Sequence, residues 1–142
     1  MFLGEYEYKV DSKGRLPLPP KFRPEFKAGL VLTKGPEECI VIYRKSDFDK
    51  VAGTFANKTI PKSKIRKFNR LTFGNAFPIE MDGQGRIALP QTLRNRAHIG
   101  ATVMLIGANN VIELWNPDKW NAEQVDADGQ SWQIIESLEE PQ

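Results

Sequence analysis

The 142-residue sequence contains one cysteine and one histidine, and this scarcity excludes several kinds of functional site. Cys39 has no second cysteine for a disulfide or a cysteine-cluster metal site, and its apolar strand pattern favours packing as a small hydrophobic side chain. His98 has no carboxylate motif around it, so we expect a surface or turn position. Because glycine-rich phosphate loops and metal-ligand spacings are also absent, we predict no enzyme activity, metal, cofactor or small-molecule substrate.

Long hydrophobic runs are absent as well. No stretch approaches the roughly 18–20 apolar residues of a membrane-spanning helix. The start, Met1–Tyr6, does not combine a basic segment with a long apolar run, so we expect no secretory signal. The hydrophobic fraction of 40% and the three tryptophans suffice for a packed core. We therefore expect a cytoplasmic protein without membrane contact.

Acidic residues are scarce in the first half of the chain, and basic residues are scarce in the second half. Residues 1–74 contain 16 Lys and Arg against 8 Asp and Glu, whereas residues 75–142 contain 4 against 10. Residues 121–142 hold six acidic residues and no Lys or Arg. The net charge of +2 is therefore the sum of a basic front half and an acidic second half. The basic half is compatible with a polyanionic partner or with an unevenly charged surface.

An internal repeat organises the sequence. The segment Asp11-Ser-Lys-Gly-Arg15-Leu-Pro-Leu-Pro19 returns as Asp82-Gly-Gln-Gly-Arg86-Ile-Ala-Leu-Pro90, at an offset of 71 residues. Two further pairs of segments match in the same order: Phe22-Arg23 with Leu93-Arg94 at an offset of 71, and Cys39–Tyr43 with Val111–Trp115 at an offset of 72. Because the register is kept over successive elements, we interpret the chain as two copies of one module.

Each copy is predicted to be rich in short strands. Tyr6 and Tyr8 alternate with charged residues, which is the period of a half-buried strand. Asp11–Gly14 supplies turn chemistry, Pro17 limits the next strand to a short or edge position, and further strands flank Gly35-Pro36. Because isolated hairpins are marginally stable, we expect the two copies to supply each other's missing face in an interlocked, pseudo-two-fold β structure.

Helices are expected around the strands. The capping-box spacing of Ser46–Asp49 predicts the start of one helix, and Asn116 before a proline predicts the start of another. Residues 62–72 form a third candidate helix with apolar positions along one side. Residues 121–142 allow two interpretations, a weak amphipathic helix or a loosely ordered tail.

The paired Asp-x-x-x-Arg motifs, each followed by Leu-Pro, resemble the MraZ family, a branch of the swapped-hairpin AbrB-like superfamily. The N-terminal Met-Phe-Leu-Gly-Glu-Tyr and the segment Pro20–Arg23 match the family too, and the resemblance covers about residues 1–120. It implies a transcriptional regulator, often of the division and cell-wall gene cluster, that binds repeated short promoter sites. It also implies association with the nucleoid and assembly into rings of many subunits.

The repeat and the resemblance together predict a mainly β fold with peripheral helices (α+β). We expect two tandem AbrB-like swapped-hairpin modules, interlocked as a pseudo-two-fold β-barrel. The predicted divisions are a first module at residues 5–50, linking helices at 51–75, a second module at 76–121 and an acidic C-terminal tail at 122–142.

The turn of each module is the candidate binding site for double-stranded DNA. Arg15 and Arg86 each present a guanidinium that can bond two acceptors at once, on phosphate or on a guanine edge. The family resemblance favours this role. Lys13 adds a mobile charge to the first turn, whereas its counterpart Gln84 is neutral but able to bond an adenine edge or a phosphate oxygen. We therefore expect the first copy to give more of the electrostatic affinity.

The other turn residues are predicted to be structural. Asp11 and Asp82 stabilise turns through their side chains, whereas a carboxylate repels phosphate. Gly14 and Gly85 let the backbone approach a ligand closely. One alternative stays open, in which each arginine pairs with its own aspartate merely to fix the turn.

A second basic cluster contains no acidic residue and consists of Lys58, Lys62, Lys64, Arg66, Lys67 and Arg70. It is compatible with DNA binding, with an ordinary solvated helix face, or with a subunit contact to the acidic tail. Lys21, Arg23 and Arg94 are equally compatible with phosphate contacts and with a solvated surface, so they are not assigned to the site.

The sequence therefore predicts a DNA-binding transcriptional regulator that forms a homo-oligomer larger than a dimer. The competing function is an oligomeric assembly or adaptor protein, such as an antitoxin-like module that binds another protein. The acidic, tryptophan-bearing tail is compatible with that alternative.

Overall fold

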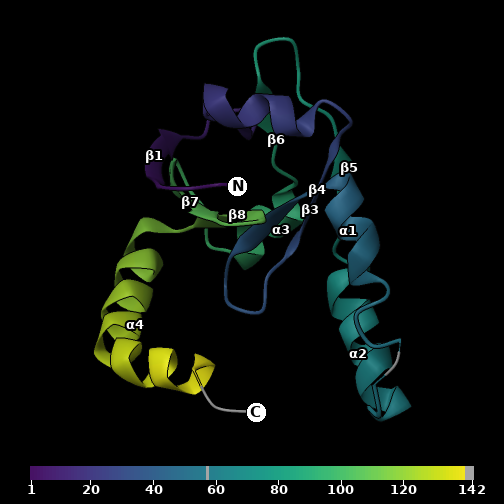
Figure 1. The fold of residues 1–142 in the computed structure, drawn as a ribbon. Coiled ribbons are helices and arrows are strands. Elements are labelled where there is room, and N and C mark those ends of the chain that lie inside the picture. The colour runs from purple at the N-terminus through teal and green to yellow at the C-terminus, as the bar shows by residue number, and fades with distance from the viewer. Residues whose placement is uncertain (57, 140–142) are drawn as a thin grey trace.

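The strands of the two sequence copies lie side by side in a computed structural model, which describes residues 1–56 and 58–139 (Figure 1). The elements, in chain order, are β1 (Glu5–Lys9), β2 (Arg15–Pro17), the 3-10 helix η1 (Pro20–Phe26), β3 (Leu30–Lys34), β4 (Ile40–Arg44), α1 (Lys45–Val51), α2 (Lys62–Thr72), β5 (Phe77–Ile79), β6 (Arg86–Ala88), α3 (Gln91–Arg96), β7 (Thr102–Ala108), β8 (Val111–Trp115) and α4 (Pro117–Leu138). The expected α+β class, with helices around a mainly β centre, is confirmed.

Strand pairing joins the two copies throughout. Six strands form one antiparallel sheet in the order β1-β7-β8-β4-β3-β5, and β2 pairs with β6 in a separate ribbon. Each strand of the first copy therefore has a neighbour in the second, because β1 pairs with β7, β2 with β6, β3 with β5 and β4 with β8. The interlocking expected from the repeat is present in this pairing.

The expectation of a closed barrel must be corrected. Among the described residues, β1 and β5 form the two edges of the six-stranded sheet, and no strand bridges them. The ribbon strands β2 and β6 have three residues each, and Pro17 in β2 has no N–H to donate to a further strand. The ribbon therefore lies over the sheet instead of closing it.

The sheet buries side chains on both faces. In β4, Ile40 and Ile42 point into the larger core, whereas Val41 and Tyr43 point to the opposite face. This is the two-residue period of a strand. The larger core is formed with the ribbon, η1 and α3, and its most deeply buried members include Phe2, Leu16, Phe26, Ile87, Leu93 and Leu105. The ribbon is thus fixed on one face of the sheet by its own apolar residues.

The helices agree with the sequence in part. The helix over residues 62–72 is confirmed as α2, and Asn116 caps α4 by accepting bonds from the N–H groups of Asp118 and Lys119 at 2.8 and 3.1 Å. The capping box at Ser46 is wrong, because α1 begins at Lys45. The Asp47 carboxylate is instead held by Arg44, whose Nε donates to Oδ2 over 2.7 Å.

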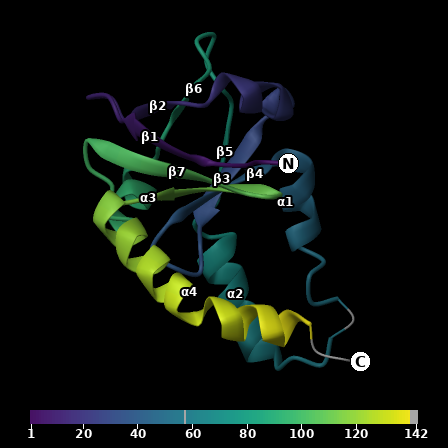
Figure 2. The same cartoon turned by 60° about the vertical axis from the view of Figure 1, so that its left-hand side comes forward.

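Two helical arms extend from the other face of the sheet. In Figures 1 and 2, α2 and α4 project toward the end of the molecule that is opposite the β6 hairpin. Of the two interpretations of residues 121–142, the helical one holds as far as Leu138. No helix in the described part of the chain is long and apolar enough to cross a membrane.

Candidate nucleic-acid interface

The first turn is built around the carboxylate of Asp11. Its Oδ1 accepts bonds from the N–H groups of Lys13 and Arg15, both at 2.9 Å, and its Oδ2 accepts one from Arg15 Nε at 2.7 Å. Gly14 adopts a φ of 77°, which an L side chain tolerates poorly, and its N–H donates to the Asp11 carbonyl at 3.0 Å. The turn is therefore specified by residues that are adjacent in sequence.

The second turn repeats this geometry. Asp82 Oδ1 accepts bonds from the N–H groups of Gln84 and Arg86 at 2.9 Å, and Arg86 Nε donates to Oδ2 at 2.8 Å. Gly85 has a φ of 75°, and its N–H donates to the Asp82 carbonyl at 3.0 Å. The two copies thus place the same groups in the same positions although Lys13 is replaced by Gln84.

These bonds stabilise the ionised carboxylates. The N–H of Arg15, and then its side chain, lower the pKa of Asp11 from 3.8 to about 2. The N–H of Arg86 is the main cause of the lowered pKa of Asp82, and the Arg86 side chain adds to it. Both turns therefore hold one ion pair each at neutral pH.

The two turns are tied to one another through the β2–β6 ribbon. The N–H of Leu18 donates to the Gly85 carbonyl at 3.0 Å, and the N–H of Leu89 donates to the Gly14 carbonyl at 2.8 Å. Each turn is therefore supported by the strand of the other copy. Figure 2 shows both turns at the edge of the molecule away from the α2 and α4 arms.

Arg23 and Arg94, which the sequence did not assign to the site, also make contacts between the two copies. Arg23 Nε donates to the Leu18 carbonyl at 2.9 Å, and a Cβ placed on Gly85 would overlap the Arg23 guanidinium. Arg94 Nε donates to a main-chain carbonyl in the same way at 3.0 Å, and a Cβ on Gly14 would lie 2.9 Å from its Cζ. The signal that could have found them was present, since Phe22-Arg23 and Leu93-Arg94 match within the repeat.

The guanidinium groups of the turn arginines face outward. Leu16 and Ile87 point into the core from the centre of the ribbon, so Arg15 and Arg86 lie on its outer face. The Arg15 side chain is 33% exposed and that of Arg86 26%. Within the part of the chain that the structure describes, only the Nε atoms have partners, so the terminal nitrogens of both groups are open to a ligand.

The paired register brings these two arginines close together. Arg15 lies opposite Ala88, and Arg86 lies opposite Pro17. With strands about 4.8 Å apart and a rise of about 3.3 Å per residue, the Cα atoms of Arg15 and Arg86 lie roughly 8 Å apart. Lys13 and Gln84 are exposed in the two turns, which lie at opposite ends of the antiparallel ribbon. The structure thus places Arg15 and Arg86 on one ribbon, with Lys13 beyond one end and Gln84 beyond the other.

The second basic cluster lies elsewhere. Lys62, Arg66 and Arg70 are exposed on α2, at the end of the molecule opposite the turns (Figure 1). The cluster therefore does not extend the surface formed by the turns. The surroundings of the remaining sequence candidates do not favour catalysis. Cys39 is buried, and burial raises the pKa of its thiol. His98 is exposed and has a φ of 54°.

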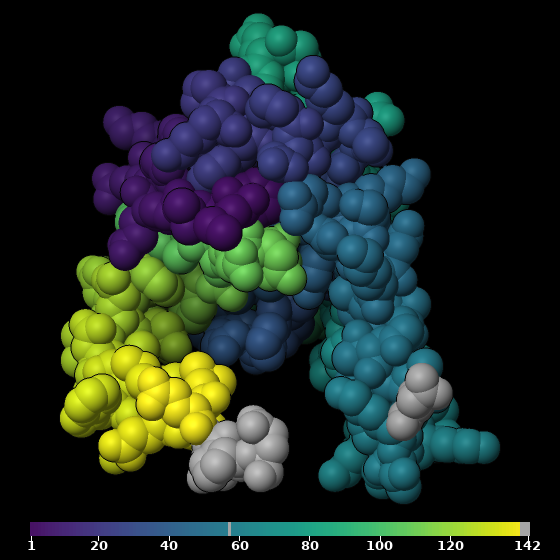
Figure 3. Space-filling model, in the orientation of Figure 1, coloured from purple at the N-terminus to yellow at the C-terminus, as the bar shows by residue number. Residues whose placement is uncertain are grey.

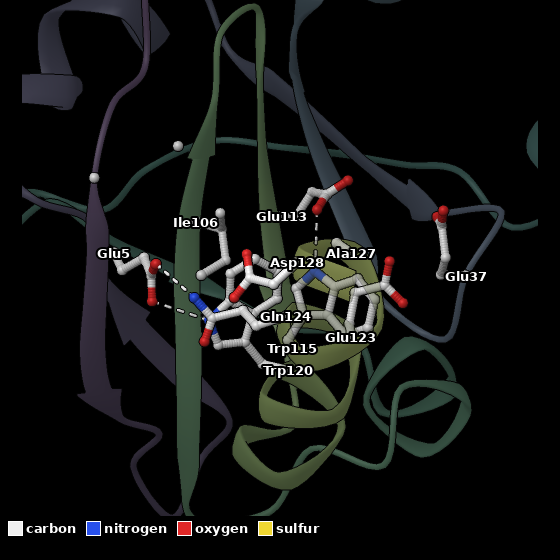
Figure 4. A pocket seen from close by; sticks show the side chains of 12 residues that line it. Glu5, Glu37, Ile106, Glu113, Trp115, Trp120, Glu123, Gln124, Ala127 and Asp128 are labelled. Atoms are coloured by element: carbon white, nitrogen blue, oxygen red, sulfur yellow. Dashed lines mark hydrogen bonds between the residues drawn. The ribbon is translucent and has the colours of Figure 1, made fainter. Parts of the chain in front are cut away.

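A hollow of about 440 Å³ beside α4 has the wrong charge for phosphate. It lies between β1, β7, β8 and α4, and Figure 4 shows several carboxylates around the indoles of Trp115 and Trp120. Burial raises the pKa of Glu113 at its wall. A nucleic acid would be repelled by this surface, so the hollow is not part of the candidate interface.

Comparison with known proteins identifies the module. The family model described as "MraZ protein, putative antitoxin-like" matches residues 1–71 and again residues 72–133. A protein of Dehalococcoides mccartyi named Transcriptional regulator MraZ is 44% identical over 141 residues, which is 99% of each chain.

Two further relatives carry the same name. The protein of Lactobacillus gasseri is 37% identical and covers 99% of this chain and 98% of its own length. That of Roseiflexus sp. is 37% identical and covers 84% of each. The names of these relatives describe transcriptional regulation, a role without catalysis. The chain described here belongs to the MraZ family.

Proposed function

We propose that this protein regulates transcription by binding double-stranded DNA through its two Asp-x-x-x-Arg turns. The observation that carries the proposal is the pairing of two equivalent arginines, Arg15 and Arg86, on the outer face of one ribbon. Each Nε donates to an aspartate, while the terminal nitrogens have no partner among the described residues. The ion pair therefore orients the guanidinium and leaves its terminal nitrogens available for DNA. An oriented guanidinium loses less freedom when it bonds a base or phosphate.

The other turn residues have graded roles in this proposal. Lys13 binds phosphate as a point charge, and Gln84 bonds a base edge or a phosphate oxygen. Asp11 and Asp82 hold the arginines, and Gly14 and Gly85 keep the positive φ that the turns require. The first copy therefore contributes more of the salt-dependent affinity than the second.

A single chain covers a short stretch of DNA. The Cα atoms of Arg15 and Arg86 lie roughly 8 Å apart, and each guanidinium bonds the aspartate of its own turn, so one chain reaches only a few nucleotide steps of about 3.4 Å. Specific binding at a promoter therefore needs several chains on repeated sites, and we propose a homo-oligomer, in the form of a ring, as the binding species. The family resemblance supports this assembly. It also supports the division and cell-wall gene cluster as the target and the cytoplasmic nucleoid as the location.

The exchange of strands between copies supports the swapped-hairpin module of the resembled superfamily. The divisions at residues 5–50, 51–75, 76–121 and 122–142 stay predictions. The family matches fall one on each copy, with their boundary at residues 71 and 72.

Titration of duplexes that carry one or several copies of a selected site tests the proposal. Random duplexes are first selected on the protein, and the enriched site is then placed once or in tandem. Several linked contacts raise the effective concentration, so tandem sites should bind far more tightly than one site. Affinity should also fall steeply with salt, because phosphate contacts release counterions.

The opposite results would contradict it. Equal affinity for one and several sites would refute binding by an oligomer with many turns. Failure of selection to enrich any site, together with no retention on heparin, would favour the adaptor or antitoxin-like function.

A further inference from the structure

The distal half of α4, residues 128–138, leaves the body of the protein with its apolar side chains uncovered. In the described residues, five of the eight exposed large hydrophobic side chains lie on α4: Val125, Trp132, Ile134, Ile135 and Leu138. All residues from Asp128 to Glu139 are exposed. An isolated helix of this length is marginal in water, and Gly129 weakens it further. This segment therefore needs a surface that covers it.

The proximal half of α4 is anchored and sets the direction of the helix. Trp120 Nε1 and Gln124 Nε2 each donate to the Glu5 carboxylate at 3.0 Å, and the Trp120 ring lies 5.5 Å from that of Trp115 (Figure 4). Ala127 lines the hollow beside these rings, and Leu138 comes 11 residues later in the helix. Eleven residues are about three helical turns, so the apolar face continues past the edge of the sheet on the same side.

A complementary groove lies on the other arm of the molecule. The α2 groove is an apolar cavity of about 400 Å³ between α1, α2 and the β3–β4 connection. Its apolar walls are formed by Val41, Tyr43, Val51, Phe68 and Leu71. Leu71 is 52% exposed at this site, so the groove is also an incompletely covered apolar surface.

The two surfaces carry opposite charges. No acidic residue occurs between Asp49 and Glu80, and α2 itself carries five basic residues. No Lys or Arg follows Lys119, while α4 carries Asp126, Asp128 and Glu136 and is followed by Glu139 at its C-cap. Two α4 helices packed on one another would bring like charges together, whereas α4 against α2 pairs opposite charges.

We propose that the distal half of α4 of one chain packs into the α2 groove of a second copy. In Figure 3 the two arms stand on opposite sides of an open hollow, so one chain offers the helix on one side and the groove on the other. Such a head-to-tail contact uses different surfaces on the two partners and repeats from chain to chain until it closes. The inference rests on the proposed homo-oligomer and names the surfaces that build it.

Light scattering on the full chain at micromolar concentration tests the contact. Ile135→Asp places a charge on the apolar face of α4, and Leu71→Asp places one in the α2 groove. Each variant should be a monomer, while the wild-type protein is larger than a dimer. Gln133→Asp and Asn69→Asp add the same charge to the opposite sides of the same two helices, and both controls should keep the wild-type mass.

Mixing the two variants gives the sharpest result. Each variant retains the surface that the other has lost, so an equimolar mixture has one intact contact and should stop at a dimer. A mixture that remains monomeric would overturn the proposal, because the two surfaces would then not bind one another. Should Leu71→Asp fail to fold by circular dichroism, the exposed charge reversal Arg70→Glu takes its place.

The outcomes separate this inference from the proposed assembly. A monomeric wild-type protein would contradict the oligomer itself. A wild-type oligomer whose mass is unchanged by Ile135→Asp and by Leu71→Asp would leave the oligomer intact and overturn only the α4–α2 contact.

Discussion

The guanidinium of Arg23, in the first copy, lies directly across Gly85, in the turn of the second copy, where a Cβ would overlap it. Arg94 lies across Gly14 in the symmetrical position. The two DNA-binding turns that we propose are therefore supported from outside their own module. A change in one copy should consequently disturb the turn of the other.

Gly85→Ala should lower the melting temperature. Alanine at a φ of 75° is strained by roughly 1–2 kcal/mol, and its Cβ must also displace Arg23. Thermal unfolding followed by circular dichroism measures the effect. Gly83→Ala in the same turn is the control, because a Cβ there would meet nothing within 4 Å. Equal melting temperatures for the two variants would refute the close contact.

Arg23→Ala should weaken both stability and DNA binding. The lost bond to the Leu18 carbonyl is that of a charged donor, which is worth about 1–3 kcal/mol. The second turn also loses its support, so Arg86 is held less firmly. The exposed Lys27→Ala removes the same charge without this contact and should leave the free energy of unfolding within about 0.5 kcal/mol of wild type. DNA affinity that falls equally in both variants would assign Arg23 only a general charge effect.

Asp11→Asn should remove part of the pH dependence of stability. The pKa of Asp11 is lowered in the folded protein from 3.8 to about 2, so its ionisation stabilises the fold above pH 3.8. That contribution disappears as the pH falls through about 2. The difference in melting temperature between wild type and Asp11→Asn should therefore be constant above about pH 5 and shrink toward pH 2. A constant difference over the whole range would show that the charge of Asp11 is unimportant.

Local chemistry in the sequence predicted the turns and the larger helices. Asp11 and Gly14 act within four residues of chain, so their roles follow from neighbours in sequence alone. Asn116 is a similar case, since it caps α4 through the next three residues. The repeat additionally predicted that the copies interlock, because each copy is too small to cover its own strands.

Long-range contacts explain what the sequence did not predict. Arg23 and Arg94 lie across glycines of the other copy, and the repeat marks them as equivalent positions without indicating that contact. The barrel expectation failed because sequence alone did not show that β2 and β6 pair only in a three-residue ribbon. The position of the basic α2 helix, far from the turns, likewise depends on tertiary packing.

Arg86→Ala should weaken DNA binding less than Arg15→Ala. The two ion pairs have nearly equal lengths of 2.8 and 2.7 Å, so geometry does not distinguish the turns. Their neighbours do, because Lys13 adds a charge to the first turn and Gln84 adds none. Affinity should therefore also depend less on salt in Lys13→Ala than in Gln84→Ala. The reverse order of the two arginine variants would contradict the inequality of the copies.

The affinity of Arg15→Ala for a tandem-site duplex tests the central claim most directly, when it is measured beside Arg66→Ala. Both variants lose one arginine, the first from the turn and the second from α2 at the other end of the molecule. A good base contact is worth about 1–3 kcal/mol, so Arg15→Ala should bind roughly 5- to 150-fold more weakly for each chain that engages the site. Arg66→Ala should stay close to wild type, and neither variant should unfold. An Arg15→Ala protein that melts at a lower temperature but binds DNA normally would contradict the claim, because Arg15 would then only fix its own turn.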